Sequence, residues 1–246
     1  MSYINDMDQR LRNILILDIE TVALESDFTK ISEGLKKHWE RKAGFIRNED
    51  ELTSEELFEE RAGIYAEFGK VIAVAFGFYH EEAGKLTFRV KCLADHDEKT
   101  LLTRLKEEVL LKFDQQELKL CAHNGKEFDF PYLCRRMLIN DIKLPDVLNT
   151  GGKKPWEVNH IDTLEMWKFG DRKSYTSLDL LTTIFDIPSN KTDMDGSMVN
   201  EIYYKEKDGL KRIEQYCLGD VIATAQLYLR LNSLPIIAKE NITVVS

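Results

Sequence analysis

Residues 13–21 read NILILDIET, a short apolar run that ends in two acids. A run of this length, rich in isoleucine and leucine, favours a buried strand. Successive side chains of a strand point to opposite faces, so Asp18 and Glu20 share one face. Two carboxylates held together beside apolar residues repel each other and lose hydration. A bound divalent cation would offset that cost, whereas a strand end that faces solvent would avoid it.

Residues 25–68, which follow this strand, are highly charged, and their apolar residues recur at helical spacing. Thr53 and Glu56 have the spacing of a capping box, which marks the beginning of a helix. We therefore expect a helical hairpin, with a loop near residues 44–50, inserted after the first strand.

The rest of the chain alternates between strand patterns and helix patterns. Strand patterns cover residues 70–79, 86–92, 118–122 and 158–161. Amphipathic helical spacing covers residues 98–113, 128–138 and the stretch to about 232, with breaks at 170–173 and 188–195. This order predicts one α/β domain, residues 1–246, with a mixed five-stranded sheet flanked by helices and a helical insertion at about residues 25–68.

Three further residues are candidates for chemistry. Tyr216 and Asp220 are four apart in a strongly helical stretch, so they share one face of that helix. Asp129 begins the helix expected at residues 128–138, directly after an Asn124-Gly125 turn. Each residue has a plain alternative: a surface acid beside a half-buried tyrosine, and a first-turn acid favoured by the helix dipole.

Taken together and in order, these segments resemble a known set of motifs. DIET (18–21), NGKEFD (124–129) and YCLGD (216–220) resemble the three motifs of the DEDDy 3′–5′ exonucleases, and most of all the proofreading domain of family B DNA polymerases. The similarity covers about residues 14–231 and implies an RNase H-like (DnaQ-like) fold. Gln215 stands where the histidine subtype would carry its histidine, so Tyr216 identifies the tyrosine subtype.

The resemblance implies roles for these residues in phosphodiester hydrolysis by two metal ions. Asp18, Glu20, Asp129 and Asp220 would bind two divalent ions, Mg²⁺ or Mn²⁺, which prefer carboxylate oxygens. Tyr216 would orient the attacking water, because a phenol with a pKa near 10 is a poor base at neutral pH. Asp18, Glu20, Asp129, Tyr216 and Asp220 are thus the candidate catalytic residues.

Candidate substrate contacts come from the same motifs and the loops between them. Thr21, Asn124 and Phe128 are the motif residues expected to touch substrate, and His123 is expected to have a structural or substrate-edge role. Base stacking is open to Phe128, Phe130, Tyr132 and Trp156, with core packing the better explanation for Phe128 and Tyr132. Lys153, Lys154, Lys168, Arg172 and Lys173 are candidates for phosphate binding or simply solvated charge, and Asp162 is a candidate auxiliary acid.

The leading function is 3′–5′ exonuclease action on the 3′ end of single-stranded DNA, in DNA repair. A 3′–5′ exoribonuclease is a second enzyme hypothesis, since only a contact to the 2′-hydroxyl would separate the two. A non-catalytic nucleic-acid- or protein-binding module on the same fold is a third, although none of the motif acids is missing. An RNase H-like endonuclease or transposase would share the first acid but would not need Tyr216. Three roles are open to the insertion at residues 25–68: a lid, a surface that binds a protein partner, or a substrate selector.

Net charge at first argues against a nucleic-acid partner, since the 246 residues include 34 Lys and Arg against 43 Asp and Glu, a net −9. The charge is unevenly placed, however. Residues 25–68 hold 12 acids and 7 bases, a net −5, and the four expected metal ligands account for the remaining −4. Two divalent cations would cancel the charge of these four acids. The expected grip on nucleic acid is therefore short, local and metal-dependent.

Three sequence features that are missing indicate where in the cell the protein is expected. The cysteines Cys92, Cys121, Cys134 and Cys217 lack the spacing of a zinc site, and we expect reduced thiols. The polar N-terminus lacks the apolar core of a signal peptide, and the longest apolar run, residues 71–79, is too short to span a bilayer. These features predict a cytoplasmic protein without membrane contact. With only 26 residues after Asp220, we expect a stand-alone exonuclease without a polymerase domain.

Overall fold

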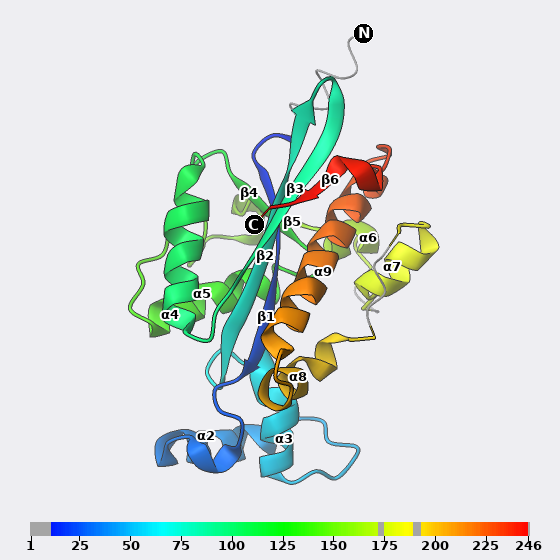
Figure 1. The fold of residues 1–246 in the computed structure, drawn as a ribbon. Coiled ribbons are helices and arrows are strands. Elements are labelled where there is room, and N and C mark those ends of the chain that lie inside the picture. Colours follow the sequence, from blue (N-terminus) through cyan, green and yellow to red (C-terminus); the bar gives the residue numbers. More distant parts are fainter. Residues whose placement is uncertain (1–10, 172–174, 189–192, 246) are drawn as a thin grey trace.

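The computed structural model describes residues 11–171, 175–188 and 193–245. Its centre is a six-stranded sheet with the order β5-β4-β1-β2-β3-β6 (Figure 1). The strands are β1 (Ile14–Ala23), β2 (Gly69–Glu82), β3 (Lys85–Ala94), β4 (Lys119–Ala122), β5 (Ile161–Asp162) and β6 (Ile242–Val244). β1, β2 and β3 are antiparallel, whereas β4, β5 and β6 each join a neighbour in parallel. The predicted mixed α/β fold is confirmed.

The sheet has one strand more than predicted. β6 pairs in parallel with the outer edge of β3, opposite Phe88, Arg89 and Val90. It is three residues long and Val244 is exposed, so neither alternation nor a buried apolar run marks it in the sequence. β5 is likewise short and begins later than the strand predicted at residues 158–161.

Helices cover both faces of the sheet. α4 (Glu98–Arg104) and α5 (Asp129–Ile139) lie on one face and α9 (Gly209–Leu231) on the other (Figure 1). α6 (Thr163–Lys168), α7 (Leu178–Ile184) and α8 (Val199–Lys205) lie on the side of α9. The core residues of β1 alternate accordingly: Leu15 and Leu17 pack with α4 and α5, and Ile14 and Ile16 pack with α9. Within the described residues, no helix combines the length and apolar character needed to cross a bilayer.

The helix predicted over residues 98–113 changes form part-way. After α4, residues Leu105–Val109 form a wider π turn (η3), and Leu110–Lys112 form a short 3₁₀ turn (η4). Leu105, Val109 and Leu110 are all buried. Since Leu110 is five residues after Leu105, the π turn lets both leucines face the core.

The insertion after β1 forms the helices predicted for it, α2 (Glu33–Ala43) and α3 (Ser54–Arg61), followed by the 3₁₀ turn η2 (Ala62–Ile64). The Thr53–Glu56 capping box is present at the beginning of α3. Trp39 and Phe58 are fully buried in a hydrophobic cluster of the insertion, with ring centroids 5.4 Å apart. Helices α2 and α3 lie beyond the end of β1 that follows the two acids (Figure 1).

Candidate active site

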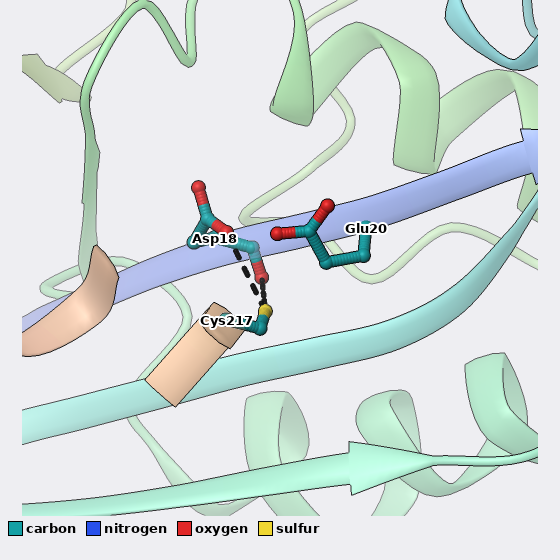
Figure 2. Close-up of side chains that lie close together, drawn as sticks. All are labelled: Asp18, Glu20 and Cys217. Atoms are coloured by element: carbon teal, nitrogen blue, oxygen red, sulfur yellow. Dashed lines mark hydrogen bonds between the residues drawn. The ribbon is translucent and has the colours of Figure 1, made fainter. Parts of the chain in front are cut away.

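Asp18 and Glu20 lie on the face of β1 that is covered by α9, as strand alternation predicts. Their carboxylate oxygens and the sulfur of Cys217 on α9 lie within 4.8 Å of one another (Figure 2). The register of β1 against β2 shifts between Glu20 and Thr21, a bulge directly after the second acid. Bulges bend a strand and re-aim its side chains, and here the pairing with β2 resumes after the bulge, from Thr21 to Ala23.

The sequence motifs did not assign a role to Cys217. Its thiol donates to Asp18, at 3.4 Å from Oδ2 and 3.5 Å from the backbone oxygen (Figure 2). Cys217 is fully buried, as are Ile213 and Val221, one turn away on either side. This helical series on the inner face of α9 is the sequence signal that could have placed Cys217 against β1.

Asp129 reaches the site from the beginning of α5. The pairing of β1 with β4 ends at Ile16 and Cys121. Beyond that point the backbone N–H of Ile19 donates to Asp129 Oδ1 at 3.1 Å. The Asp129 carboxylate therefore accepts a backbone N–H of β1 at a point where the pairing with β4 has ended. Since Ile19 lies between Asp18 and Glu20 in the strand, this bond holds Asp129 close to both acids.

Tyr216 and Asp220 complete the group from α9. They lie one helical turn apart, as predicted, and the Tyr216 hydroxyl hydrogen-bonds to the Asp220 carboxylate. Burial raises the pKa of Tyr216 far above its usual value, and the charge of Asp220 raises it further. The phenol is therefore a permanent hydrogen-bond donor at neutral pH rather than a base.

The four carboxyl groups are electrostatically linked. Burial raises the pKa of Asp18 and Glu20 well above the usual range, and the other carboxylates raise it further. Burial also raises the pKa of Asp129 to about 7 and that of Asp220 to about 6. Such a group is costly to ionise without a counter-charge. Because all four donors are carboxylates, they fit hard divalent cations such as Mg²⁺ or Mn²⁺.

A cleft of about 730 Å³ opens over this group. Asp18, Tyr216 and Asp220 line one side of it, while Glu20 and Asp129 are buried and are not part of its lining. Tyr175 and Asp179, which the sequence analysis did not single out, also line the cleft. They come from the segment around α7, whose distance from the motifs along the chain hides their proximity.

The candidate substrate residues within the motifs are mostly engaged by the protein itself. Thr21 forms a side-chain hydrogen bond with Tyr132. Asn124 adopts a left-handed backbone (φ 64°) and donates its backbone N–H to Asp162 at 2.9 Å. Phe128 is half-buried against Tyr132, with ring centroids 5.3 Å apart. None of the three lines the cleft.

The four candidate stacking residues divide by burial. Phe130 is only 5% exposed and Tyr132 only 1% exposed, so both are core residues and base stacking by them is ruled out. Phe128 is half-buried, as core packing predicts. Trp156 is 75% exposed, with the Lys154 ammonium 5.2 Å from its ring centroid.

His123 has the structural or cleft-edge position expected for it. Its Nε2 donates to the Thr176 carbonyl at 2.9 Å, its Nδ1 pairs with the Thr163 hydroxyl at 2.9 Å, and it lines the cleft. Burial lowers its pKa, and the charge of Lys168 acts in the same direction. Of the other candidate phosphate-binding residues, Lys153 and Lys154 are exposed, whereas Arg172 and Lys173 lie outside the described residues.

Comparison with known proteins identifies the family of the chain. Residues 64–239 match the model of a family described as "predicted 3′–5′ exonuclease related to the exonuclease domain of PolB". The match includes Asp129, Tyr216 and Asp220 and begins after Asp18 and Glu20, which the fold brings to the same place. No curated protein matches the chain. Since the match covers more than two thirds of the sequence, the chain belongs to this family of 3′–5′ exonucleases related to the PolB exonuclease domain.

Proposed function

We propose that the protein removes nucleotides from the 3′ end of single-stranded DNA with two divalent metal ions. The observation that carries the proposal is the convergence of four acids from β1, α5 and α9 at one cleft. Their carboxylates lie close enough to repel one another. Asp18, Glu20, Asp129 and Asp220 are the proposed ligands of Mg²⁺ or Mn²⁺. When bound, these ions supply an activated water and stabilise charge on the phosphate and the leaving oxygen.

The remaining roles belong to the protein's own groups. Tyr216 is a hydrogen-bond donor at the edge of the carboxylate group, and its interaction with Asp220 supports a role beside the proposed metal ions. We assign it the orientation of the attacking water, a positioning effect that lowers the entropic cost of reaction. Cys217 donates to Asp18 from below and helps to hold that side chain in place.

DNA is favoured as the substrate by the relation of the family to the exonuclease domain of PolB, a DNA polymerase. Trimming of single-stranded 3′ ends would suit a role in DNA repair. Further substrate contacts are available outside the group of four acids. The exposed Trp156 offers a ring for base stacking, and Lys154 beside it and Lys168 near His123 offer positive charge.

The test compares DNA and RNA oligonucleotides of the same sequence, labelled at the 5′ end, with Mg²⁺ or Mn²⁺. We expect a ladder that shortens from the 3′ end, faster on DNA, and its loss in Asp18→Ala. Asp97→Asn is the matched control, because Asp97 is an exposed helix cap of α4 that donates nothing to the site. Faster cleavage of RNA would favour an exoribonuclease. Binding without hydrolysis of either polymer would overturn the proposed activity and favour a binding module.

A further inference from the structure

Asp162 is a buried acid outside the cleft. It is the last residue of β5, immediately before α6, and it is 3% exposed. It is not among the residues that line the cleft, so it does not meet substrate as an auxiliary acid would. An acid so deeply buried needs a specific set of partners.

Both carboxylate oxygens of Asp162 accept backbone N–H groups. Oδ1 accepts from Leu164 at 2.9 Å and from Glu165 at 3.3 Å, which caps the N-terminus of α6. The same oxygen accepts from Asn124 at 2.9 Å, and Oδ2 accepts from Lys126 at 3.1 Å. The cap explains the first pair, as at many helices. The second pair joins α6 to the loop between β4 and α5.

That loop leads directly into Asp129, the first residue of α5. The N–H of Phe128 donates to the carbonyl of Asn124 at 3.0 Å, and the N–H of Phe130 donates to that of Gly125 at 2.9 Å. Gly125 leaves no room for a side chain, since a Cβ there would lie 2.4 Å from that of Ala122. The loop is therefore tight, and a shift at Asn124 or Lys126 moves the beginning of α5 and its first residue, Asp129.

Neighbouring contacts hold the same junction from the α6 side. Lys126 forms an ion pair with Glu165 at 2.7 Å, and the Thr163 hydroxyl pairs with His123.

We propose that Asp162 is a positioning residue of the exonuclease site, which holds the β4–α5 loop so that Asp129 meets the backbone of Ile19 and binds metal. This inference rests on the proposed function, because it assigns Asp129 to a metal ion. Residues that hold a metal ligand in place without touching the metal change metal affinity or activity by about 10- to 100-fold when they are replaced.

The decisive variant is Asp162→Asn, which has the same shape. Its amide oxygen can keep the bonds of Oδ1, while its NH₂ faces the Lys126 N–H, donor against donor. We expect the Mn²⁺ dissociation constant of the full-length protein, measured from the electron paramagnetic resonance of free Mn²⁺, to rise about 10-fold. We expect kcat on single-stranded DNA to fall about as much, with KM changed less than about twofold. Asp97→Asn, the matched loss of a helix-cap charge, should change neither.

A double-mutant cycle tests whether Asp162 acts through Asp129. In an Asp129→Asn background, Asp162→Asn should add no further loss of Mn²⁺ affinity, because the group through which it acts is gone. Asp162→Ser is the second variant: its hydroxyl can cap α6, but it cannot reach both loop N–H groups, and it should reproduce the weaker metal binding.

The outcomes separate the two proposals. If the wild type neither binds Mn²⁺ nor hydrolyses DNA, the proposed function fails. If the wild type does both and either Asp162 variant binds Mn²⁺ as tightly, the positioning role is wrong. Fully additive losses in the cycle would also contradict it, since they would make Asp162 independent of Asp129.

Discussion

At the residue scale, Asp129 is a buried acid whose charge costs stability in the absence of metal. Its pKa is raised to about 7 by burial. Between the pKa of an unfolded aspartate, about 4, and this value, the folded protein binds more protons than the unfolded chain. The contribution of Asp129 to stability therefore falls as pH rises through that window.

Asp129→Asn should remove this penalty while its amide oxygen still accepts from Ile19. In EDTA at pH 8 we expect the free energy of unfolding to increase by about 2 kcal/mol over wild type, and at pH 4 by much less. Denaturant unfolding at both pH values measures it. Asp97→Asn should instead decrease the free energy of unfolding at pH 8, since hydrogen bonds to Thr100 stabilise the charged form of Asp97 and lower its pKa. Equal pH dependence of wild type and Asp129→Asn would contradict the prediction.

Tyr216 should act in the chemical step rather than in metal binding. Tyr216→Phe removes only the hydroxyl, so we expect kcat to fall about 10- to 100-fold with Mn²⁺ affinity unchanged. Because burial and the charge of Asp220 raise the pKa of the phenol, the wild-type rate should show no loss from phenol ionisation up to pH 10. An unchanged rate in Tyr216→Phe would remove the hydroxyl from the mechanism.

At the element scale, one buried ion pair joins α4, α5, β2 and the insertion. Arg136 on α5 donates to Glu98 on α4 at 2.9 and 2.5 Å, and both side chains are less than a tenth exposed. Glu98 also accepts the Val71 N–H of β2 at 2.7 Å, and Arg136 donates to the Ala66 carbonyl at 2.8 Å. Helix α5, which begins with Asp129, is thus fastened to the end of the insertion.

Arg136→Ala should leave the charge of Glu98 buried without its partner. We expect the free energy of unfolding to fall by about 3–5 kcal/mol, measured by denaturant unfolding at pH 7.5. Glu201→Gln is the control: it breaks an exposed pair with Lys205 on α8 and should change stability by less than about 0.5 kcal/mol. A loss below 1 kcal/mol in Arg136→Ala would show that the pair is not a structural junction.

The insertion is also fastened on its other side. The Asn200 side chain accepts the N–H of Ala23 at 2.9 Å and donates to the Glu59 carbonyl at 2.7 Å, and the Tyr204 hydroxyl donates to the Ala23 carbonyl at 2.7 Å. With Tyr132 donating to the Gly63 carbonyl at 2.7 Å, both the entry and the exit of the insertion are bonded to helices of the exonuclease fold. These contacts favour an insertion that stays fixed against the rest of the fold over one that opens and closes as a lid.

At the scale of the whole molecule, the metal site should contribute to stability. Adding Mg²⁺ at 100 times its dissociation constant stabilises a folded protein by about 2.7 kcal/mol. For a chain of this length we expect Tm at pH 8 to rise by about 5–10 °C over EDTA, in a thermal unfolding scan. Asp18→Ala should lose most of that shift. An equal shift in this variant would place the stabilising ion elsewhere.

The net charge of −9 should show in the salt dependence of DNA binding. Duplex-binding proteins with 6–10 phosphate contacts lose affinity steeply with salt. Because the acidic excess sits on the insertion and at the proposed metal site, we expect the logarithm of the affinity for a single strand to fall against the logarithm of the salt concentration with a slope of only about −2, measured in Ca²⁺ to prevent hydrolysis. A slope near −6 would reveal a long basic track and contradict a local grip at the strand end.

Local patterns predicted much of this protein. Alternation along β1 put Asp18 and Glu20 on one face, the four-residue spacing of α9 put Tyr216 beside Asp220, and the capping box marked the beginning of α3. Each prediction rests on a period of two or 3.6 residues, which belongs to a single strand or helix and needs no partner element.

The tertiary structure alone decided how the elements meet. It brought Asp129 to Ile19 across 110 residues, and it turned Asp162 from an expected acid of the site into a buried acceptor of backbone N–H groups. It also added β6 to the sheet edge. Contacts of this kind depend on packing between distant segments, which no periodicity within one segment encodes. The sequence by itself therefore determined which residues are able to do the proposed chemistry, and the fold decided which of them lie together.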